Sequence, residues 1–309
     1  MPIAAVKRDT GLGTDTLRVW EKRYGFPQPL RDHCGDRLYP PEQVEKLRVV
    51  KRLLDAGHRP GRIVNLHLEE LIRLSQKNER EGACIETPPN GLGELKAYMA
   101  LIKSHKAEEF RETMARLLLT KGLQRFLIEV VAPMNTLVGD AWARSYFEVF
   151  EEHLYTECIQ VILRNAISTL ARSQKAPRIL LTTFPGESHA LGLLMAECLF
   201  AMEGAHCLSL GVQTPIPDIV MAVKSQHIHI VALSFSSVQS SMGVLDSIAE
   251  LKRQLPALTQ IWCGGASSAL RRKTTDDFVL LQSLNDISAS IKNWRQQHSQ
   301  AGLPESGGC

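Results

Sequence analysis

The stretch Gly186-Glu187-Ser188-His189-Ala190-Leu191-Gly192 lies between two apolar segments. The segment before it, 178–183, reads as a strand, and the segment after it, from 193 on, reads as a helix. The order places His189 on a loop at the carboxyl end of a strand, the edge where open α/β sheets bind ligands. An imidazole is a good ligand for a transition metal, and Glu187 can orient its second ring nitrogen. The alternative is an ordinary strand-to-helix turn, in which His189 merely begins the helix.

From residue 178 onward, strand and helix patterns alternate. The expected strands are 179–183, 205–211, 228–234 and 260–263, and the expected helices are 189–202, 216–225 and 243–254. This βαβ order predicts a doubly wound parallel sheet of the Rossmann-like class. No G-x-G-x-x-G follows the first strand, which argues against a standard dinucleotide site. Small or hydroxyl-bearing residues stand where later strands end, and they can admit or hydrogen-bond a bulky ligand: Gly211, Ser234, Ser236, Gly264 and Gly265.

The segment from 92 to about 172 has the apolar period of helices and predicts a four-helix bundle, with a break at Pro133 and a last helix over 147–170. Trp142 precedes the pair Glu152-His153 by ten residues. We expect these three side chains to converge on one cavity at the end of the bundle. The alternative is that Trp142 belongs to the core and that Glu152-His153 is a solvated helix face.

The first part of the chain is basic. Residues 1–62 hold thirteen basic and eight acidic side chains, a charge of +5, which leaves −2 for the remainder of a chain whose net charge is +3. Expected helices at 3–9 and 13–23 flank a glycine turn, with Thr14 as the predicted N-cap of the second. A hairpin at 31–38 and helices from 40 and over 63–75 follow. A basic helix-turn-helix with such a wing indicates a polyanionic partner.

Composition sets the remaining limits. The chain has no apolar run long enough to cross a membrane and no signal-peptide core, and its seven cysteines are scattered without a CxxC pair. We therefore expect a cytoplasmic protein with reduced thiols. A stretch rich in Pro and Gly reads as an interdomain linker. The predicted organisation is a DNA-binding domain at 1–77, a linker at 78–91, a helical cap at 92–175, a sheet domain at 176–298 and a tail at 299–309.

The head resembles the DNA-binding domain of the MerR family of transcription regulators. The resemblance rests on Thr10-Gly11, Thr16-Leu17-Arg18-Val19-Trp20-Glu21-Lys22-Arg23-Tyr24-Gly25 and Gly35-Asp36-Arg37-Leu38-Tyr39. The chain departs from the family pattern at Asp36 in the wing and at Met1-Pro2, which leaves little room for a leading strand. The resemblance implies a double-stranded DNA operator and a homodimer or homotetramer. It also implies the DNA-contacting residues Thr14, Thr16, Arg18, Lys22, Arg23, Arg31, Arg37 and Tyr39. The alternative is a small basic helical domain without a DNA role.

The sheet domain resembles cobalamin-binding domains. Their pattern of DxHxxG, a serine element and a Gly-Gly stands here as Glu187-Ser188-His189-Ala190-Leu191-Gly192, Ser234-Phe235-Ser236 and Gly264-Gly265. Trp142 with Glu152-His153 is similar to the Wx9EH signature of MerR-type light-dependent repressors of the CarH and LitR type. The resemblance implies that His189 is the lower axial ligand of cobalt, with the cofactor tail passing Ser234, Ser236 and Gly264-Gly265. It places Trp142, Glu152 and His153 over the upper face.

Two departures from the family pattern stand out. Glu187 stands where the family has Asp, which adds a methylene to the partner of His189, and Ser236 stands where it often has Leu, in the expected lining of the tail groove. The resemblance implies a non-enzymatic transcription regulator controlled by adenosyl- or methylcobalamin, with light as a candidate signal. The alternatives are a corrinoid-carrying enzyme component, and a regulator whose sensor domain reads another ligand or a protein.

Overall fold

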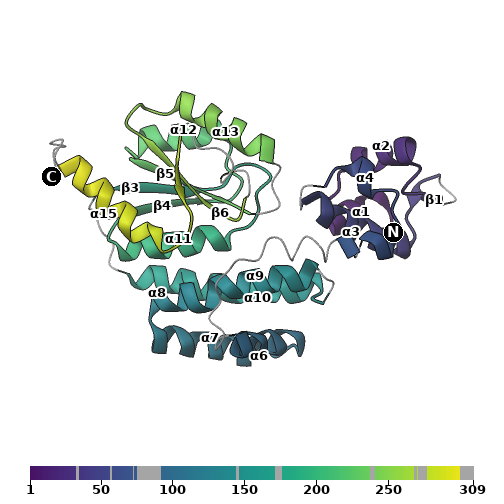
Figure 1. Ribbon diagram of the computed structural model, residues 1–309, viewed down its shortest axis with the longest axis horizontal. Coiled ribbons are helices and arrows are strands. Elements are labelled where there is room, and N and C mark those ends of the chain that lie inside the picture. The colour runs from purple at the N-terminus through teal and green to yellow at the C-terminus, as the bar shows by residue number, and fades with distance from the viewer. Residues whose placement is uncertain are drawn as a thin grey trace. The chain divides into compact units, whose positions relative to one another are not determined.

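The computed structural model describes residues 1–32, 35–55, 58–71, 73–74, 92–143, 146–170, 176–236, 241–267, 270 and 277–299. The chain divides into two compact units, Met1–Glu86 with Gly139–Phe147, and Thr87–Val138 with Glu148–Cys309. Figure 1 shows the helices and strands of both units. The predicted linker and residues 300–309 of the predicted tail lie outside the described residues, so the predicted domain boundaries stay predictions. Among the described residues, no helix combines the length and apolar character needed to span a bilayer.

The head is a winged helix-turn-helix. Its elements are α1 (Ile3–Thr10), α2 (Thr14–Tyr24), β1 (Leu30–Arg31), β2 (Arg37–Leu38), α3 (Pro41–Asp55) and α4 (Pro60–Ile63). The two strands pair antiparallel and form the predicted wing. The apolar stripes of the helices meet in one core that includes Leu17, Trp20, Leu47, Val50 and Leu53. Burial of these stripes holds the short helices together, since helices of this length are marginal alone.

Two local predictions for the head are wrong. Thr14 is the first residue of α2 and not its cap, because Gly13 takes the N-cap position and no side chain caps the helix. The expected helix over 63–75 is interrupted: α4 ends at Ile63, a turn follows, and helix resumes at 68–71. At the start of the chain, where little room for a leading strand is expected, α1 begins at Ile3 and Pro2 forms one isolated β-bridge with Leu38 of the wing.

The helical layer contains four rods among the described residues. They are α6 (Leu92–Lys103), α7 (Ala107–Lys121), the continuous run α8 (Leu123–Phe126), η1 (Leu127–Val131) and α9 (Ala132–Ala143), and α10 (Val149–Thr169). The predicted break at Pro133 is wrong. A proline cannot donate to the carbonyl four residues back, and the π-helical turns of η1 shift bonding to the fifth residue, as Ala132 N–H to Leu127 O shows. The helix therefore continues through the proline.

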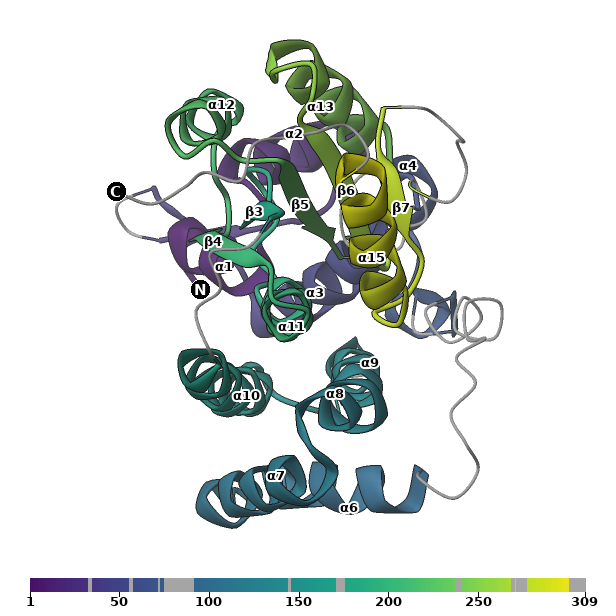
Figure 2. The same ribbon diagram turned by 90° about the vertical axis from the view of Figure 1, so that its left-hand side faces the viewer.

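The helical layer packs on the sheet domain through α10 and α11 (Leu191–Met202), which lie side by side in Figure 2. Buried Tyr155 of α10 donates a hydrogen bond to Asn135 of α9. The Asn135 amide in turn lies 3.7 Å from the Met195 sulfur of α11. Burial raises the pKa of Tyr155, so its hydroxyl keeps its proton and remains a donor.

The sheet is parallel, with strand order β4-β3-β5-β6-β7. Its strands are β3 (Arg178–Thr182), β4 (His206–Gly211), β5 (Ile230–Phe235), β6 (Gln260–Gly265) and β7 (Val279–Leu281). Helices α12 (Ile216–Ser225) and α13 (Ser241–Gln254) cover one face, and α11 and α15 (Asp286–Ser299) cover the other (Figures 1 and 2). The predicted doubly wound sheet is confirmed. β7 adds a strand that the sequence did not predict.

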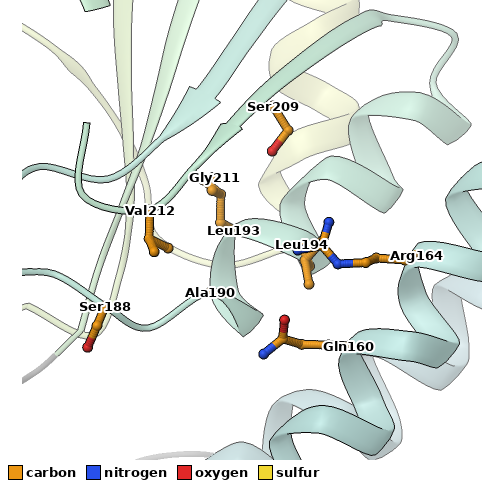
Figure 3. A pocket seen from close by; sticks show the side chains of 9 residues that line it. All are labelled: Gln160, Arg164, Ser188, Ala190, Leu193, Leu194, Ser209, Gly211 and Val212. Atoms are coloured by element: carbon orange, nitrogen blue, oxygen red, sulfur yellow. The ribbon is translucent and has the colours of Figure 1, made fainter. Parts of the chain in front are cut away.

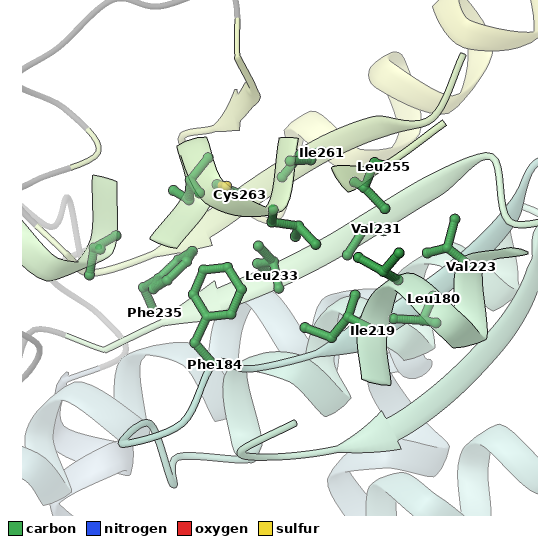
Figure 4. Packing of buried hydrophobic residues seen from close by; sticks show 14 of the residues in the cluster. Leu180, Phe184, Ile219, Val223, Val231, Leu233, Phe235, Leu255, Ile261 and Cys263 are labelled. Atoms are coloured by element: carbon green, nitrogen blue, oxygen red, sulfur yellow. The ribbon is translucent and has the colours of Figure 1, made fainter. Parts of the chain in front are cut away.

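A cluster of buried hydrophobic side chains forms the core under α12 and α13. Leu180, Val231 and Ile261 from the strands pack with Ile219 of α12 (Figure 4). Val244 of α13 belongs to the same cluster. Strands buried on both faces explain why these segments are continuously hydrophobic and do not alternate. The order of the strands reverses between β3 and β5, and a doubly wound sheet binds its ligand at the carboxyl ends of the strands flanking such a point.

Candidate ligand site at the carboxyl edge of the sheet

The loop between β3 and α11 buries the side chain of Glu187 and exposes that of His189. Gly186 has a φ of 88°, a conformation that L side chains rarely adopt, and it makes the sharp turn after Phe184. The Thr183 hydroxyl donates to the Glu187 carbonyl at 2.7 Å. As a result the Glu187 side chain is 1% exposed and that of His189 is 58% exposed. α11 begins at Leu191, so His189 stands on the loop and does not start the helix.

The Glu187 carboxylate holds the site together through four hydrogen bonds. Its Oε1 accepts from the His189 ring Nδ1 at 2.5 Å and from the His189 backbone N–H at 3.0 Å. Its Oε2 accepts from the Ser236 backbone N–H at 2.8 Å and from the Ser236 hydroxyl at 2.7 Å. Ser236 follows β5, so one carboxylate joins the two loops at the point where the strand order reverses.

These bonds determine the charge of Glu187 and which His189 ring nitrogen donates to it. Burial by itself raises the pKa of Glu187, but the hydrogen bonds from His189 and Ser236 outweigh it and bring the pKa to about 2. Glu187 is therefore ionised at neutral pH and acts only as an acceptor. Nδ1 of His189 therefore carries a proton, and in the neutral form of the ring the lone pair is on Nε2. A neutral imidazole fixed in this tautomer by a carboxylate is the arrangement that metal-binding histidines use.

The small residues predicted at the site lie where backbones approach closely. A Cβ on Gly192 would meet the Ser234 hydroxyl at 2.8 Å, so the first turn of α11 lies directly against the end of β5. A Cβ on Gly265 would come to 2.1 Å from the Phe235 carbonyl oxygen, and Gly265 has a φ of 114°. Gly264 pairs with Ser234 in register. The structure thus brings Gly192, Ser234 and Gly264-Gly265 to the same edge as His189.

The predicted residues of the helical layer are placed as follows. Glu152 and His153 stand in the first turns of α10, where His153 Nδ1 lies 2.7 Å from Glu152 Oε2. The other Glu152 oxygen accepts from the Thr156 hydroxyl at 2.7 Å. Trp142 lies half-buried near the end of α9. Their convergence over His189 stays a prediction.

A cavity of about 290 Å³ borders the loop of His189. Ser188 and Ala190 line it from the loop, Gln160 and Arg164 line it from α10, and Ser209 lines it from β4 (Figure 3). The sequence did not predict this cavity. Gln160 and Arg164 follow His153 by seven and eleven residues, a spacing that returns to one face of a helix, and this was the available signal.

The head presents most of the predicted DNA contacts on its surface. Arg18, Lys22, Arg23 and Arg31 are exposed, and Thr14 and Thr16 are half-buried on α2. The prediction that Tyr39 contacts DNA is wrong, because its side chain is 1% exposed and belongs to the core of the head.

Arg37 is partly engaged within the head. Its Nε donates to Glu21 of α2 at 2.8 Å, so Arg37 ties the wing to this helix. The departure Asp36 is exposed and closes the wing, since its N–H donates to the Asp32 carboxylate at 2.9 Å.

Comparison with known proteins supports both halves of this description. Residues 1–68 match the family described as MerR HTH family regulatory protein. The HTH-type transcriptional repressor CarH of Myxococcus xanthus is 26% identical over 258 residues, which cover 84% of this chain and 86% of CarH. The repressor CarA of the same organism is 27% identical over 234 residues, 75% of this chain and 75% of CarA.

Among solved structures, the monomethylamine corrinoid protein of Methanosarcina barkeri is similar, with a TM-score of 0.52 and 13% sequence identity. The similarity covers 64% of this chain and 96% of the corrinoid protein, and at this identity it shows the fold alone. The chain therefore joins a MerR-type helix-turn-helix N-terminus to a C-terminal part with the fold of corrinoid-binding proteins, and it is homologous to CarH and CarA over most of its length.

Proposed function

We propose that this protein is a cytoplasmic, non-enzymatic transcription regulator that binds DNA through its head and is controlled by cobalamin bound at His189. The observation that carries the proposal is the Glu187–His189 pair on the loop after β3, with Nδ1 bonded to a buried carboxylate. The names of CarH and CarA, both transcriptional repressors, support repression as the output. A MerR-type head supports DNA as the partner.

The residues at the sheet edge fit a cobalt corrinoid. A neutral imidazole with Nε2 as its lone-pair nitrogen is the donor that a cobalt ion takes in place of the cofactor's own base. Gly192, Gly264 and Gly265 keep side-chain bulk away from the end of β5 beside that donor. We assign His189 as the cobalt ligand, Glu187 as its orienting partner, and Ser234, Ser236 and the glycines as the wall for the cofactor tail.

On the helical side we assign Trp142, Glu152 and His153 to the upper face of the cofactor. Bound cobalamin supplies a cobalt–carbon bond that light or chemistry can break. Trp142, Glu152 and His153 would contact the part of the cofactor that this bond holds, so its presence or absence would bias the assembly of the helical layer. Such a ligand acts by shifting a population between assemblies, a homodimer and a homotetramer being the expected pair, and thereby sets how the heads meet DNA.

The test of the cofactor assignment is uptake in the dark. The purified full chain is incubated with adenosyl-, methyl- and hydroxocobalamin, and the absorbance spectrum is recorded after free cofactor is removed. We expect a bound corrinoid whose spectrum reports histidine coordination, and we expect His189→Ala to lose that signature. His67→Ala, an exposed histidine of the head, is the matched control. Equal uptake and an equal spectrum for His189→Ala would refute the ligand assignment.

The test of light as the signal uses the loaded protein. Sedimentation and affinity for a DNA site selected from a random pool are measured before and after illumination. We expect both to change with adenosyl- or methylcobalamin. If both are indifferent to light while the loaded and unloaded proteins differ, the protein is a chemical cobalamin sensor. If no corrinoid is taken up, the sensor domain reads another ligand.

A further inference from the structure

The cavity of about 290 Å³ beside His189 has polar walls on two sides. Gln160 and Arg164 stand one turn apart on α10 and extend toward the loop and β4 in Figure 3. Ser188 and Ser209 add hydroxyl-bearing side chains from the loop and the strand. Because the loop of His189 itself lines the cavity, a ligand bound to that histidine would have part of its rim here.

The volume limits what can enter. Sites that enclose a whole drug-sized ligand measure roughly 300 to 1,000 Å³, and a corrin is larger than such a ligand. This cavity therefore suits a side arm and not the ring. Its apolar floor, Leu193 and Leu194 of α11, suits the short methylene stem of such an arm.

The charges around the cavity indicate which chemical group can stand at the end of such a side arm. Glu197 of α11 interacts electrostatically with Arg164 and is hydrogen-bonded to Ser209, and both of these residues line the cavity. Burial raises the pKa of Glu197, and these two contacts oppose that rise. The carboxylate partly neutralises Arg164, so the cavity offers hydrogen bonds without an unbalanced positive charge. Gln160 can both donate and accept.

We propose that this cavity is a subsite for an uncharged primary amide on the rim of the ligand whose metal binds His189. Arg164 donates to the amide oxygen, and the Gln160 oxygen accepts from the amide nitrogen. A carboxylate in the same place could accept from Arg164 and from the Gln160 N–H group, but it would leave the Gln160 oxygen unused and would face the negative charge of Glu197. The inference rests on the proposed function, since cobalamin carries primary amides around its corrin ring.

The test compares ligands and variants in the dark. Binding of cobalamin and of its monocarboxylic acids, in which one rim amide is hydrolysed, is measured by absorbance titration with the full chain. We expect at least one monocarboxylic acid to bind about tenfold more weakly, the equivalent of one lost hydrogen bond. This comparison uses the unaltered chain and does not depend on how any variant folds.

Two variants locate the effect. Gln160→Ala and Arg164→Met are expected to weaken cobalamin binding by about tenfold and to remove the preference for the amide, while the spectral signature of histidine coordination stays. Arg116→Met, an exposed arginine of α7, removes the same charge elsewhere and should change nothing.

The outcomes separate the two proposals. Tight cobalamin binding with histidine coordination, but affinities within twofold for all derivatives and variants, overturns the amide subsite and leaves the proposed function standing. Loss of the histidine signature in Arg164→Met also overturns it, because the residue would then position the loop. If the unaltered chain takes up no cobalamin, both proposals are wrong.

Discussion

At the scale of single residues, the extra methylene of Glu187 extends the reach of its carboxylate. The longer side chain lets one carboxylate reach both His189 and Ser236, with two bonds on each oxygen. Glu187→Asp would retract the carboxylate by about 1.5 Å and leave the Ser236 hydroxyl without its acceptor. We expect the free energy of unfolding to fall by about 1–3 kcal/mol.

A double-mutant cycle in urea unfolding checks this. Ser236→Ala should cost little more once Glu187→Asp is present, because the bond it removes is already broken. Fully additive losses would show that the two side chains do not act as a pair.

Gly265 makes a second prediction at this scale. Gly265→Ala combines a strained φ with a Cβ at 2.1 Å from the Phe235 oxygen, so we expect a loss of about 3 kcal/mol or more. Gly211→Ala is the matched control, because Gly211 also has a positive φ but has open space around its Cα. It should cost about 1–2 kcal/mol, the strain alone. Thermal unfolding of both variants measures the difference, and similar losses would mean that the contact relaxes cheaply.

At the scale of elements, the start of α10 is fixed to the end of α6 by a buried carboxylate. Glu151 is 2% exposed, closes a capping box with Glu148, and accepts from Lys103 Nζ at 3.0 Å. Burial raises the pKa of Glu151, but the bonds from Glu148, Lys103 and His105 lower it below its usual value overall. A group with a lowered folded pKa stabilises above its unfolded pKa, near 4.3, and this contribution disappears as pH falls through the folded value.

Glu151→Gln should therefore lower the free energy of unfolding by roughly 1–3 kcal/mol at pH 7, and the gap to the unaltered protein should shrink below about pH 4. Denaturant unfolding at several pH values measures both. Glu157→Gln, an exposed residue of the same helix, is the control. A gap that stays constant down to pH 2 would contradict the assigned charge.

At the scale of the whole molecule, the charge is divided unevenly along the chain: +5 in residues 1–62 and −2 in the rest. Association with DNA should accordingly weaken steeply with salt, since bound counterions are released from the phosphates. Lys22→Ala removes an exposed charge of α2. It should weaken binding to all DNA sequences alike and reduce the slope of log affinity against log salt by about one. Lys96→Ala on α6 is the control, and an equal change there would place the DNA contact outside the head.

Much of the fold of this molecule could be predicted from its sequence. The parallel sheet follows from buried strands alternating with helices, and the winged head follows from apolar stripes around glycine turns. β7 was not predicted because three residues are too few to show a strand's alternation. The continuation of the helix through Pro133 was not predicted because no pattern of residue types marks the π-helical turns before it. Tyr39 was misassigned because a motif names residue types but not which of them the core buries.

The candidate site divides in the same way. Local sequence determined by itself that an imidazole would stand on the loop after the first strand with a carboxylate two residues before it, since both depend on neighbours in the chain. Only the tertiary structure decided that this carboxylate also holds Ser236, and that Gln160 and Arg164 border the same loop. Ser236 lies 49 positions from Glu187, and Gln160 and Arg164 lie 24 to 30 positions from Ser188 and Ala190 of the loop. The order of the strands and the packing of the helices create these contacts, and no local sequence pattern predicts either of them.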